Sequence, residues 1–136
     1  MVDEGPNLVT TEGLAQIEAH IARLEANLKS ETNILLRETL ARDLRYWEIR
    51  KSTAELVTPS TDGTVAFGST VTIQRKGRTQ TFRIVGVDEA DASKGWISHR
   101  SPMAQALLGA RLGDIIEADE PLGEIEILAV SATEFR

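Results

Sequence analysis

The sequence predicts an α+β protein, in which an N-terminal antiparallel helical hairpin (a short coiled coil) precedes a small antiparallel sheet with one short helix. Two periodicities lead to this class. Apolar residues recur every three or four positions between Leu14 and Trp47, the spacing of one helix face. Beyond Val71 they recur at every second position, the spacing of a half-buried strand. Residues 58–64 contain a proline and an Asp-Gly pair and are interpreted as the linker between the two patterns.

Composition narrows the class of protein. Apolar residues make up 41% of the 136 residues, which is enough for a core, although aromatic residues make up only 4%. Without cysteine the chain has no disulfide framework and no thiolate chemistry. No run approaches the roughly 20 apolar residues of a membrane-spanning helix, and the acidic first residues do not resemble a signal peptide. We therefore expect a soluble, cytoplasmic protein.

The charge distribution argues against a nucleic-acid-binding surface. Fifteen basic and twenty-one acidic residues give a net charge of −6, whereas proteins that bind phosphates present a basic stripe. One basic cluster, residues 75–78, is predicted to be a hairpin turn. The other lies on the second helix among acidic residues that compensate it: Arg42, Arg45, Arg50 and Lys51 beside Asp43, Glu48 and Glu55. Sequence-specific binding of DNA or RNA is not expected.

The first helix is predicted to start at Thr10 or Thr11, either of which can cap it, with Glu12 in its first turn. Residues 1–9 contain glycine and proline and are interpreted as a flexible lead-in. An a/d heptad pattern then marks a seam along which this helix pairs with another: Leu14, Ile17, Ile21, Leu24 and Leu28.

A second helix follows, with apolar positions at Leu36, Leu40, Leu44 and Trp47. Between the two runs lies a segment without apolar residues and rich in cap-forming ones: Lys29, Ser30, Glu31, Thr32 and Asn33. We predict that this segment is the tip of a helical hairpin over residues 10–57, with antiparallel helices near 11–29 and 33–56. The alternative is one uninterrupted helix, whose seam would have to pair with a second chain.

Residues 65–136 are predicted to form the sheet domain. Its first two strands flank the turn at residues 75–78 and carry alternating apolar residues: Val71, Ile73, Phe82 and Ile84. Three further strands are predicted at residues 96–98, 115–118 and 123–130. One short helix, residues 102–109, is predicted to be capped by Ser101 and to start with Pro102. Proline is tolerated at the first helical position because an N–H there would have no intrahelical acceptor.

Seven short segments follow one another in this second half: Val65-Ala66-Phe67-Gly68-Ser69-Thr70-Val71, Phe82-Arg83-Ile84-Val85-Gly86, Asp88-Glu89-Ala90-Asp91, Ile97-Ser98, Ser101-Pro102-Met103-Ala104, Ala106-Leu107-Leu108-Gly109 and Gly113-Asp114. Together they resemble the C-terminal domain of the GreA/GreB family, bacterial factors that enter the secondary channel of RNA polymerase. The first segment is similar to that domain's opening strand. Gly13, Leu14, Ile17 and Ile21 similarly resemble the start of the family's N-terminal coiled coil.

The resemblance implies an FKBP-like fold for residues 65–136 and RNA polymerase as the partner. In the family's pattern, one turn contacts the rim of the secondary channel, and here it is formed by Ser101, Pro102, Met103 and Ala104, with Met103 as an adaptable apolar anchor. The alternative is that this corner only covers the domain's own core. No cofactor, metal or enzymatic activity is expected. Prolyl isomerisation on this fold needs an aromatic-lined pocket, and the domain has few aromatic residues for one: Phe67, Phe82, Trp96 and Phe135.

The predicted tip departs from the family's pattern. Cleavage-stimulating members carry an acidic pair there, which helps hold a second metal ion in the polymerase active site; this chain has Asn27 and Ser30 at those positions. Arms of about 20 residues extend about 30 Å, whereas the family's arms are about ten residues, or roughly 15 Å, longer. Ligation needs an oxygen within about 2.0–2.6 Å of the metal. Glu31, the only acid of the tip, is interpreted as a helix-start residue, with a residual metal contact as the alternative.

Other polar residues are predicted to be structural. His20 and His99 are isolated from further metal-ligating residue types. Ser101 lies near His99, but no third group orients such a pair, so a helix cap explains the serine better than a nucleophile. Residues 88–91 are interpreted as an acidic turn, with a cation site as the alternative.

The sequence therefore predicts a regulator of transcription elongation that binds RNA polymerase at the secondary channel without strong stimulation of transcript cleavage. Two alternatives stay open. One is an active cleavage stimulator whose hairpin is longer than predicted. The other is a protein-interaction or chaperone-like module that dimerises through the helical seam.

Overall fold

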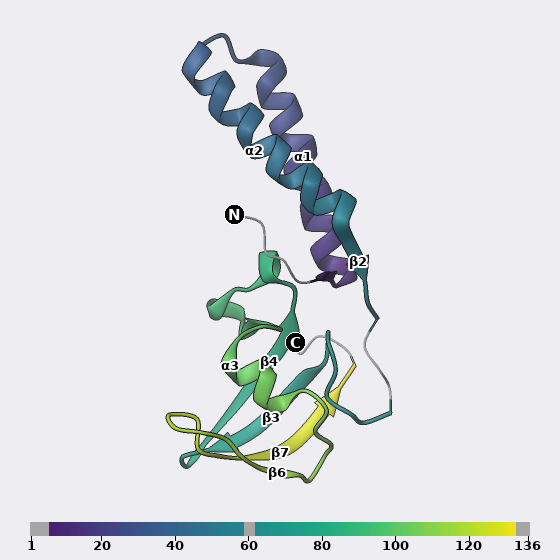
Figure 1. The fold of residues 1–136 in the computed structure, drawn as a ribbon, viewed down its shortest axis with the longest axis vertical. Coiled ribbons are helices and arrows are strands. Elements are labelled where there is room, and N and C mark those ends of the chain that lie inside the picture. The colour runs from purple at the N-terminus through teal and green to yellow at the C-terminus, as the bar shows by residue number, and fades with distance from the viewer. Residues whose placement is uncertain (1–5, 59–61, 133–136) are drawn as a thin grey trace. The chain divides into compact units, whose positions relative to one another are not determined.

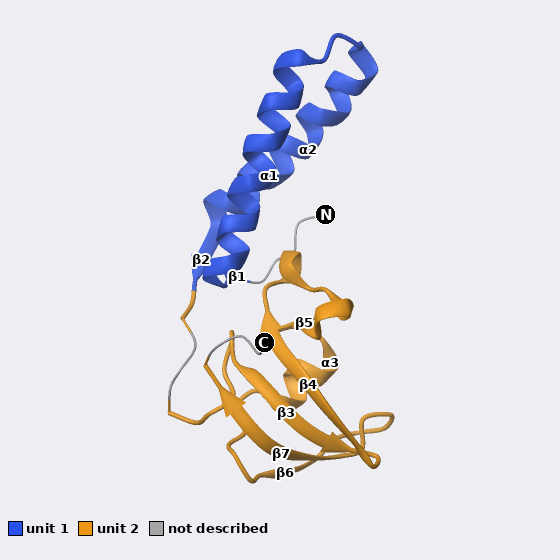
Figure 2. Cartoon of the chain, turned by 180° about the vertical axis from the view of Figure 1, so that it is seen from behind, with its two compact units in different colours: residues 1–56 blue, residues 57–136 orange. Residues whose placement is uncertain are grey.

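The structure is a computed structural model that describes residues 6–58 and 62–132. The chain divides into two compact units, residues 1–56 and 57–136 (Figure 1, Figure 2). The first is a helical hairpin and the second a five-stranded sheet with short helices, which confirms the α+β class. Within the described residues, no helix is both long enough and apolar enough to cross a membrane.

The helical unit consists of α1 (Thr11–Ser30) and α2 (Ile34–Thr53), which run antiparallel to each other (Figure 1). Between them the chain leaves helical geometry at Glu31, whose φ of −81° and ψ of 128° are extended. The predicted antiparallel hairpin is confirmed, and the alternative of one uninterrupted helix is wrong.

Side-chain caps explain where the two helices start. Thr10 Oγ1 accepts a hydrogen bond from the Gly13 N–H at 3.0 Å, and Asn33 Oδ1 accepts one from the Leu36 N–H at 3.1 Å. Each cap satisfies one of the N–H groups that a helix start leaves without an intrahelical partner. Of the two residues that the sequence offers as the cap of α1, Thr10 is the one used.

The seam between α1 and α2 is thinner than a domain core. Ile17 and Leu24 are buried, with 1% and 6% of their surface exposed. The rings of His20 and Trp47 stack across the seam with their centroids 4.4 Å apart. Other predicted seam residues are only half-buried: Leu14, Ile21, Leu28, Leu40 and Leu44. Two helices alone cover each other on one side only, which explains the partial burial.

A two-stranded parallel sheet joins the ends of the helical unit, and the sequence did not predict it. β1 (Asn7–Val9) pairs with β2 (Ala54–Leu56). The Asn7 side chain ties β1 to α2, because Nδ2 donates to the Arg50 carbonyl at 2.8 Å and Oδ1 accepts from Arg50 Nη2 at 2.7 Å. Asn7 and Arg50 are both buried, so this reciprocal pair satisfies polar groups that would otherwise be costly.

These strands correct two expectations. The flexible lead-in over residues 1–9 is wrong for residues 7–9, which pair as a strand, while residues 1–5 lie outside the described part of the chain. The second helix, predicted to reach residue 56, ends at Thr53 because residues 54–56 pair with β1 instead. Part of the predicted linker, residues 59–61, also lies outside the described residues.

The second unit is a mixed sheet with the strand order β5-β4-β3-β7-β6. Its strands are β3 (Thr70–Arg75), β4 (Arg78–Val85), β5 (Trp96–Ser98), β6 (Ile115–Glu117) and β7 (Glu124–Ser131). Neighbouring strands are antiparallel except β4 and β5, which run parallel. The expectation of a purely antiparallel sheet is wrong at this pair, because the connection crosses over instead of turning back as a hairpin.

The segment before β3 is a turn and not the start of a strand. Gly68 has a φ of 88°, in the left-handed region, and the Ser69 N–H donates to the Ala66 carbonyl at 3.0 Å. The expectation of a strand over residues 65–71 is therefore wrong before Thr70. The turn is still anchored, since the Gly68 N–H donates to the Ile84 carbonyl of β4 at 2.7 Å.

The core of this unit is aliphatic, as the low aromatic content predicts. Apolar side chains with at most 1% exposure come from β3, β4, β7, α3 (Pro102–Leu107) and the segment before β3: Val65, Val71, Ile73, Ile84, Val85, Ala104, Leu107, Ile125 and Ile127. α3 contributes Ala104 and Leu107 and packs beside β5. It ends two residues earlier than the predicted helix, whose last residue, Gly109, has a φ of 88°.

The crossover between β4 and β5 contains two 3-10 turns, η1 (Val87–Glu89) and η2 (Ala92–Lys94). It ends at Gly95, where φ is 75° and an added Cβ would lie 2.8 Å from the Thr81 carbonyl oxygen. The left-handed backbone and the close approach of β4 both require glycine at this position.

Candidate functional site

The hairpin tip, residues 29–33, is held together by an arginine from the following helix. Arg37 Nη1 donates to the carbonyl of Leu28 at 2.6 Å and to that of Glu31 at 2.8 Å. These bonds satisfy carbonyl groups that the end of a helix leaves without intrahelical partners. They also join the first turns of α2 to the end of α1, so the tip is a bonded turn and not an open loop.

Glu31 is the only acidic residue in the tip, and its carboxylate is used inside the turn. Oε2 accepts a hydrogen bond from the Asn33 N–H at 3.0 Å. Ser30 Oγ donates to the Asn27 carbonyl at 3.3 Å, so the two uncharged residues at the positions of the family's acidic pair lie beside each other at the end of α1. Glu31 is therefore a structural residue of the turn. It lies at the C-cap of α1, and Asn33 caps α2, so its interpretation as a helix-start residue is wrong.

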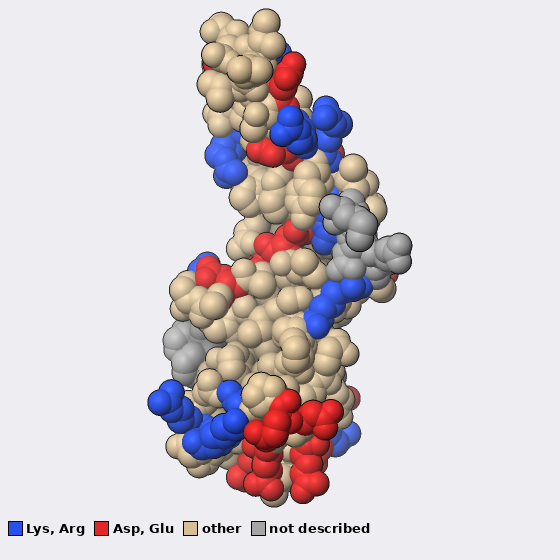
Figure 3. All heavy atoms as spheres, turned by 60° about the vertical axis from the view of Figure 1, so that its left-hand side comes forward, with Lys and Arg blue, Asp and Glu red and all other residues tan. Residues whose placement is uncertain are grey.

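The first turn of α2 presents apolar side chains to solvent. Ile34, Leu35 and Leu36 are 72%, 73% and 52% exposed. The assignment of Leu36 to the helical seam is wrong, because about half of its surface is exposed to solvent instead of being packed against α1. In Figure 3 the end of the hairpin is formed largely by uncharged residues. The run Ile-Leu-Leu directly after the Asn33 cap is the sequence signal that could have indicated this patch.

The predicted polymerase-binding turn, Ser101 to Ala104, is the capped start of α3. Ser101 Oγ accepts from the Ala104 N–H at 3.2 Å, which confirms Ser101 as the helix cap. Pro102 is exposed, Ser101 and Met103 are half-buried, and Ala104 is fully buried. Only the first three therefore offer surface to a partner. Ala104 is part of the domain's core, which corrects its inclusion among contact residues.

Both histidines are engaged in packing. His99 is buried at 8% exposure, and its ring meets Phe67 edge-on with the centroids 5.5 Å apart. Its carbonyl accepts from Gln105 Nε2 at 2.6 Å, which ties the start of the turn to α3. His20 stacks on Trp47, and its Nδ1 lies 2.7 Å from a guanidinium nitrogen of Arg23. Phe135, the last of the domain's predicted aromatic residues, lies outside the described residues.

The acidic segment 88–91 shapes the crossover before β5. Glu89 is buried, and its Oε2 accepts from the Gly86 N–H at 3.0 Å. Asp91 Oδ1 accepts from the Ser93 hydroxyl at 2.6 Å and from the Ser93 N–H at 3.0 Å. The hydroxyl bond is the main cause that lowers the pKa of Asp91 below its ordinary value, and the nearby charge of Lys94 acts in the same direction. Across residues 6–58 and 62–132, no group of three or more His, Cys, Asp or Glu side chains is placed to hold a metal ion.

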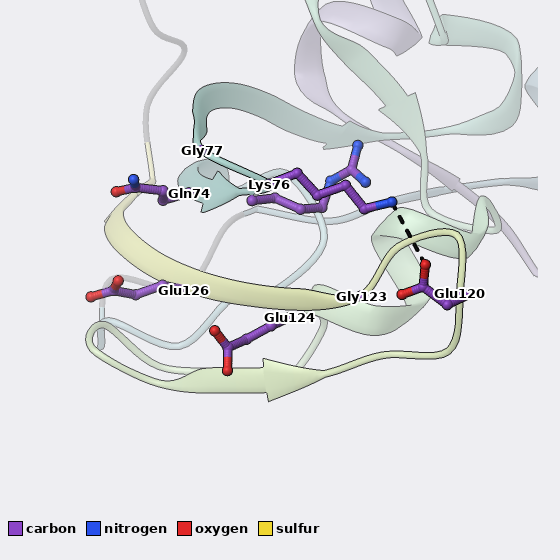
Figure 4. Close-up of a pocket in the computed structure, with 8 residues that line it drawn as sticks. Gln74, Lys76, Gly77, Glu120, Gly123, Glu124 and Glu126 are labelled. Carbon is purple, nitrogen blue, oxygen red and sulfur yellow. Dashed lines mark ion pairs between the residues drawn. The ribbon is translucent and has the colours of Figure 1, made fainter.

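A charged groove of about 500 Å³ lies between the β3–β4 turn and the β6–β7 turn (Figure 4). Lys76 Nζ lies 3.8 Å from Glu120 Oε1, and both side chains are more than half exposed. Figure 4 shows Glu124 and Glu126 pointing away from that pair. The groove therefore offers neither an apolar pocket nor a converging set of ligands, and an exposed ion pair of this kind contributes little to stability.

A comparison with protein families decides where this domain belongs. Residues 60–132, more than half of the chain, match the family model described as transcription elongation factor, GreA/GreB, C-term. The chain belongs to the GreA/GreB family. The match covers the sheet unit with its Ser101 turn and begins after the hairpin, so membership is decided by the C-terminal domain.

Curated relatives of this GreA/GreB-family chain carry the same family name. Transcription elongation factor GreA of Thermomicrobium roseum is 46% identical over 74 residues, which cover 52% of this chain and 47% of that protein. GreA of Streptococcus thermophilus is 39% identical over 100 residues, covering 71% of this chain and 59% of that protein. The chain thus spans about half the length of the curated relatives it matches.

Solved structures of related factors align at low similarity. The crystal structure of GreA factor homolog 1 (Gfh1) of Thermus thermophilus covers 93% of this chain and 99% of its own, at 20% identity and a TM-score of 0.45. The prokaryotic transcription elongation factor GreA/GreB from Nitrosomonas europaea covers 91% and 98%, at 24% identity and a TM-score of 0.46. Scores below 0.5 add no weight to the assignment, which depends on the family match.

Proposed function

We propose that this chain is a GreA/GreB-type transcription elongation factor that binds RNA polymerase at its secondary channel and does not strongly stimulate transcript cleavage. Membership of the family and the similarity to curated GreA proteins support the first part. The observation that carries the second part is the tip. Its one carboxylate, Glu31, is bonded to the Asn33 N–H, and the positions of the family's acidic pair hold Asn27 and Ser30.

The length of the hairpin supports the same conclusion. Each helix has 20 residues, so each arm spans about 30 Å at 1.5 Å per residue. The family's pattern implies arms about ten residues longer, which leaves this tip roughly 15 Å short. Metal ligation requires an oxygen within about 2.6 Å, so no rearrangement of the Glu31 side chain alone can bridge that distance.

The contact with the rim of the channel is assigned to the start of α3. Pro102 is exposed, and Ser101 and Met103 are half-buried, so these three can meet a partner surface. Ala104 supports the turn from inside the domain, at 0% exposure. In this role the chain supplies binding surface and no reacting group. We propose RNA polymerase as its partner, without a cofactor, enzymatic activity of its own or sequence-specific nucleic-acid binding.

The test joins a binding assay to a cleavage assay, with the full chain and purified core RNA polymerase. We expect the chain to bind the polymerase and to leave the RNA of a backtracked complex uncleaved above background, while a GreA protein with an acidic tip cleaves it. Cleavage by the wild-type chain would show that it is an active stimulator. Failure to bind polymerase would overturn the proposal, and a dimeric chain would then favour the interaction module.

Two sets of variants test separately whether cleavage stimulation lacks the acidic pair or the longer arms. Asn27→Asp with Ser30→Glu should remain inactive on the backtracked complex, because the arms are unchanged. Adding about ten family-like residues to each arm, together with the acidic pair, should create cleavage stimulation. Activity in the double substitution alone would show that the reach argument is wrong.

The proposed rim contact is tested by charge at the start of α3. Met103→Asp should weaken polymerase binding by about tenfold or more, as expected for loss of an apolar anchor. Because Met103 is half-buried, Pro102→Asp is tested beside it, at an exposed first-turn position where an acid suits the helix dipole. Reduced binding with an unchanged thermal midpoint in both variants supports the contact. Unfolding by Met103→Asp, with normal binding by Pro102→Asp, assigns the turn to the core.

A further inference from the structure

We propose that the hairpin tip is an apolar plug, formed by Ile34, Leu35 and Leu36, that inserts into an apolar pocket on RNA polymerase. The inference rests on the proposed function and names the chemistry of the surface that the tip meets. Three consecutive apolar side chains are 72%, 73% and 52% exposed, so most of their surface contacts nothing in the hairpin. Hydrophobic surface of this kind, gathered at one place, marks an interaction site.

The plug is held in a fixed geometry before it meets a partner. Asn33 Oδ1 caps the turn that carries it, and Arg37 joins that turn to the end of α1 through two carbonyl bonds of 2.6 and 2.8 Å. A shallow groove of about 300 Å³ borders it and is lined by Leu28, Ile34, Arg37, Glu38 and Ala41. A preorganised apolar surface loses little conformational entropy on binding, which favours its use as an anchor.

The size of the patch argues against a second copy of this chain as the occupant. Three side chains that are about two-thirds exposed offer on the order of 300 Å² of apolar area. A stable interface buries about 800 Å² on each partner. The patch also ends quickly, because the adjoining residues on α1 and in the tip are polar: Asn27, Lys29, Ser30 and Thr32. A small apolar patch at the end of a hairpin suits insertion into a concave pocket that other contacts bring within reach.

The charges around the plug argue against a lipid surface or a nucleic acid. Residues 25–38 contain three acids, Glu25, Glu31 and Glu38, and two bases, Lys29 and Arg37, which gives a net charge of −1. Anionic headgroups and phosphates bind surfaces with an excess of lysine and arginine. An uncharged run flanked by a slight acidic excess is complementary to apolar pocket walls with a neutral or basic rim on a protein.

The test measures the affinity of full-length variants for core RNA polymerase. Ile34→Ser with Leu35→Ser should weaken binding by about tenfold or more, while Ile34→Met with Leu35→Met should bind as the wild type does. The matched control is Leu112→Ser with Ile115→Ser, two side chains of the sheet unit that are 63% and 60% exposed. This control should leave the affinity unchanged. The thermal midpoints should stay near the wild-type value, because all four side chains are largely in water.

The possible outcomes distinguish a failure of the plug proposal from a failure of the proposed function on which it rests. If the wild-type chain does not bind polymerase, the proposed function fails. If the wild type and the tip serine variant bind equally well, or if the control pair weakens binding as much as the tip pair, the plug is overturned and the proposed function stands. Dimerisation that the tip serine variant abolishes in sedimentation experiments would assign the patch to a second copy. Binding to phosphatidylglycerol-containing vesicles that the same variant abolishes would assign it to a membrane. Either of these two results overturns the polymerase pocket.

Discussion

The first turns of α2 and α3 are built in the same way and lie in different surroundings. Asn33 Oδ1 accepts from the Leu36 N–H at 3.1 Å, and Ser101 Oγ accepts from the Ala104 N–H at 3.2 Å. After the cap of α2, three apolar residues are more than half exposed. After the cap of α3, Ala104 and Leu107 are fully buried.

The difference comes from what each helix can pack on. At its first turn, α2 lies beside the last turn of one helix, α1, which covers one side of it only and leaves the other side exposed. α3 belongs to a unit with a five-stranded sheet and contributes to its core. Local sequence therefore sets where a helix starts, whereas the neighbouring elements decide which apolar residues are removed from water. Apolar residues that the fold leaves exposed remain available to a partner.

The largest expected effect comes from placing a charge in the helical seam. Leu24→Asp should destabilise the hairpin by about 4 kcal/mol, because the site is 6% exposed and a buried carboxylate there has no partner. Helicity in urea unfolding measures the loss. Leu36→Asp, at 52% exposure in the first turn of α2, should change stability by less than about 0.5 kcal/mol. Equal losses in the two variants would show that the first turn of α2 is packed as tightly as the seam.

A cavity in the sheet unit gives the next largest effect. Leu107→Ala should cost about 3 kcal/mol, because the side chain is fully buried among aliphatic neighbours. Leu35→Ala, the counterpart in the exposed turn, should cost less than about 0.5 kcal/mol. Each unit contains one tryptophan, Trp47 or Trp96, so Trp→Phe backgrounds report the two unfolding transitions separately. A large loss for Leu35→Ala would contradict its assignment to an exposed plug.

Local patterns predicted the parts of the fold that depend on neighbouring residues. The helical period, Thr10, the segment after Lys29 and the Ser101-Pro102 pair mark helix limits within a few residues of sequence. β1 and β2 escaped prediction because each has three residues and the pair joins positions more than 40 residues apart, such as Asn7 and Ala54. The parallel pairing of β4 with β5 depends on the path of the crossover, which no period encodes.

The candidate site could be predicted only in part for the same reason. The sequence indicates Ser101 as a cap and shows that Asn27 and Ser30 are uncharged. It does not show that Glu31 bonds to the Asn33 N–H, because that bond depends on the conformation of the turn. The exposure of Leu36 was missed because its helical spacing matches the seam, and spacing alone does not show which residues of the first turn α1 covers.

The two caps themselves should be of similar strength, which tests whether capping is independent of burial. Asn33→Ala and Ser101→Ala should each cost about 1 kcal/mol, because each removes one acceptor for an otherwise unpaired N–H. Asn33→Asp and Ser101→Asp keep an acceptor and should retain most of the stability. The four changes in the free energy of unfolding are measured by denaturation, with the fluorescence of the tryptophan in the same unit as the signal. A cost for Ser101→Ala several times that for Asn33→Ala would show that the half-buried position of Ser101 matters more than the cap.

The smallest expected effect is a loss of stability at low pH that depends on Asp91, which the sheet unit should show and the helical unit should not. Asp91 has a lowered pKa in the folded protein, chiefly because the Ser93 hydroxyl donates to its carboxylate, so folding favours the ionised form. The unfolded chain then binds the proton more readily. The resulting stabilisation is present above the ordinary pKa of aspartate and is lost as the pH falls through the lowered folded value.

Below about pH 4, therefore, the wild-type sheet unit should lose slightly more stability than the Asp91→Asn variant, which cannot titrate at this position. Trp96 reports on this turn because Lys94 Nζ lies 4.7 Å from its ring centroid. Ser93→Ala should reduce the difference without removing it, since the Ser93 N–H still donates to Asp91 Oδ1. The transition reported by Trp47 should respond to acid equally in all three proteins, because the substitutions lie in the other unit. An identical acid response of Trp96 in the wild type and Asp91→Asn would show that the Ser93 bond does not hold in solution.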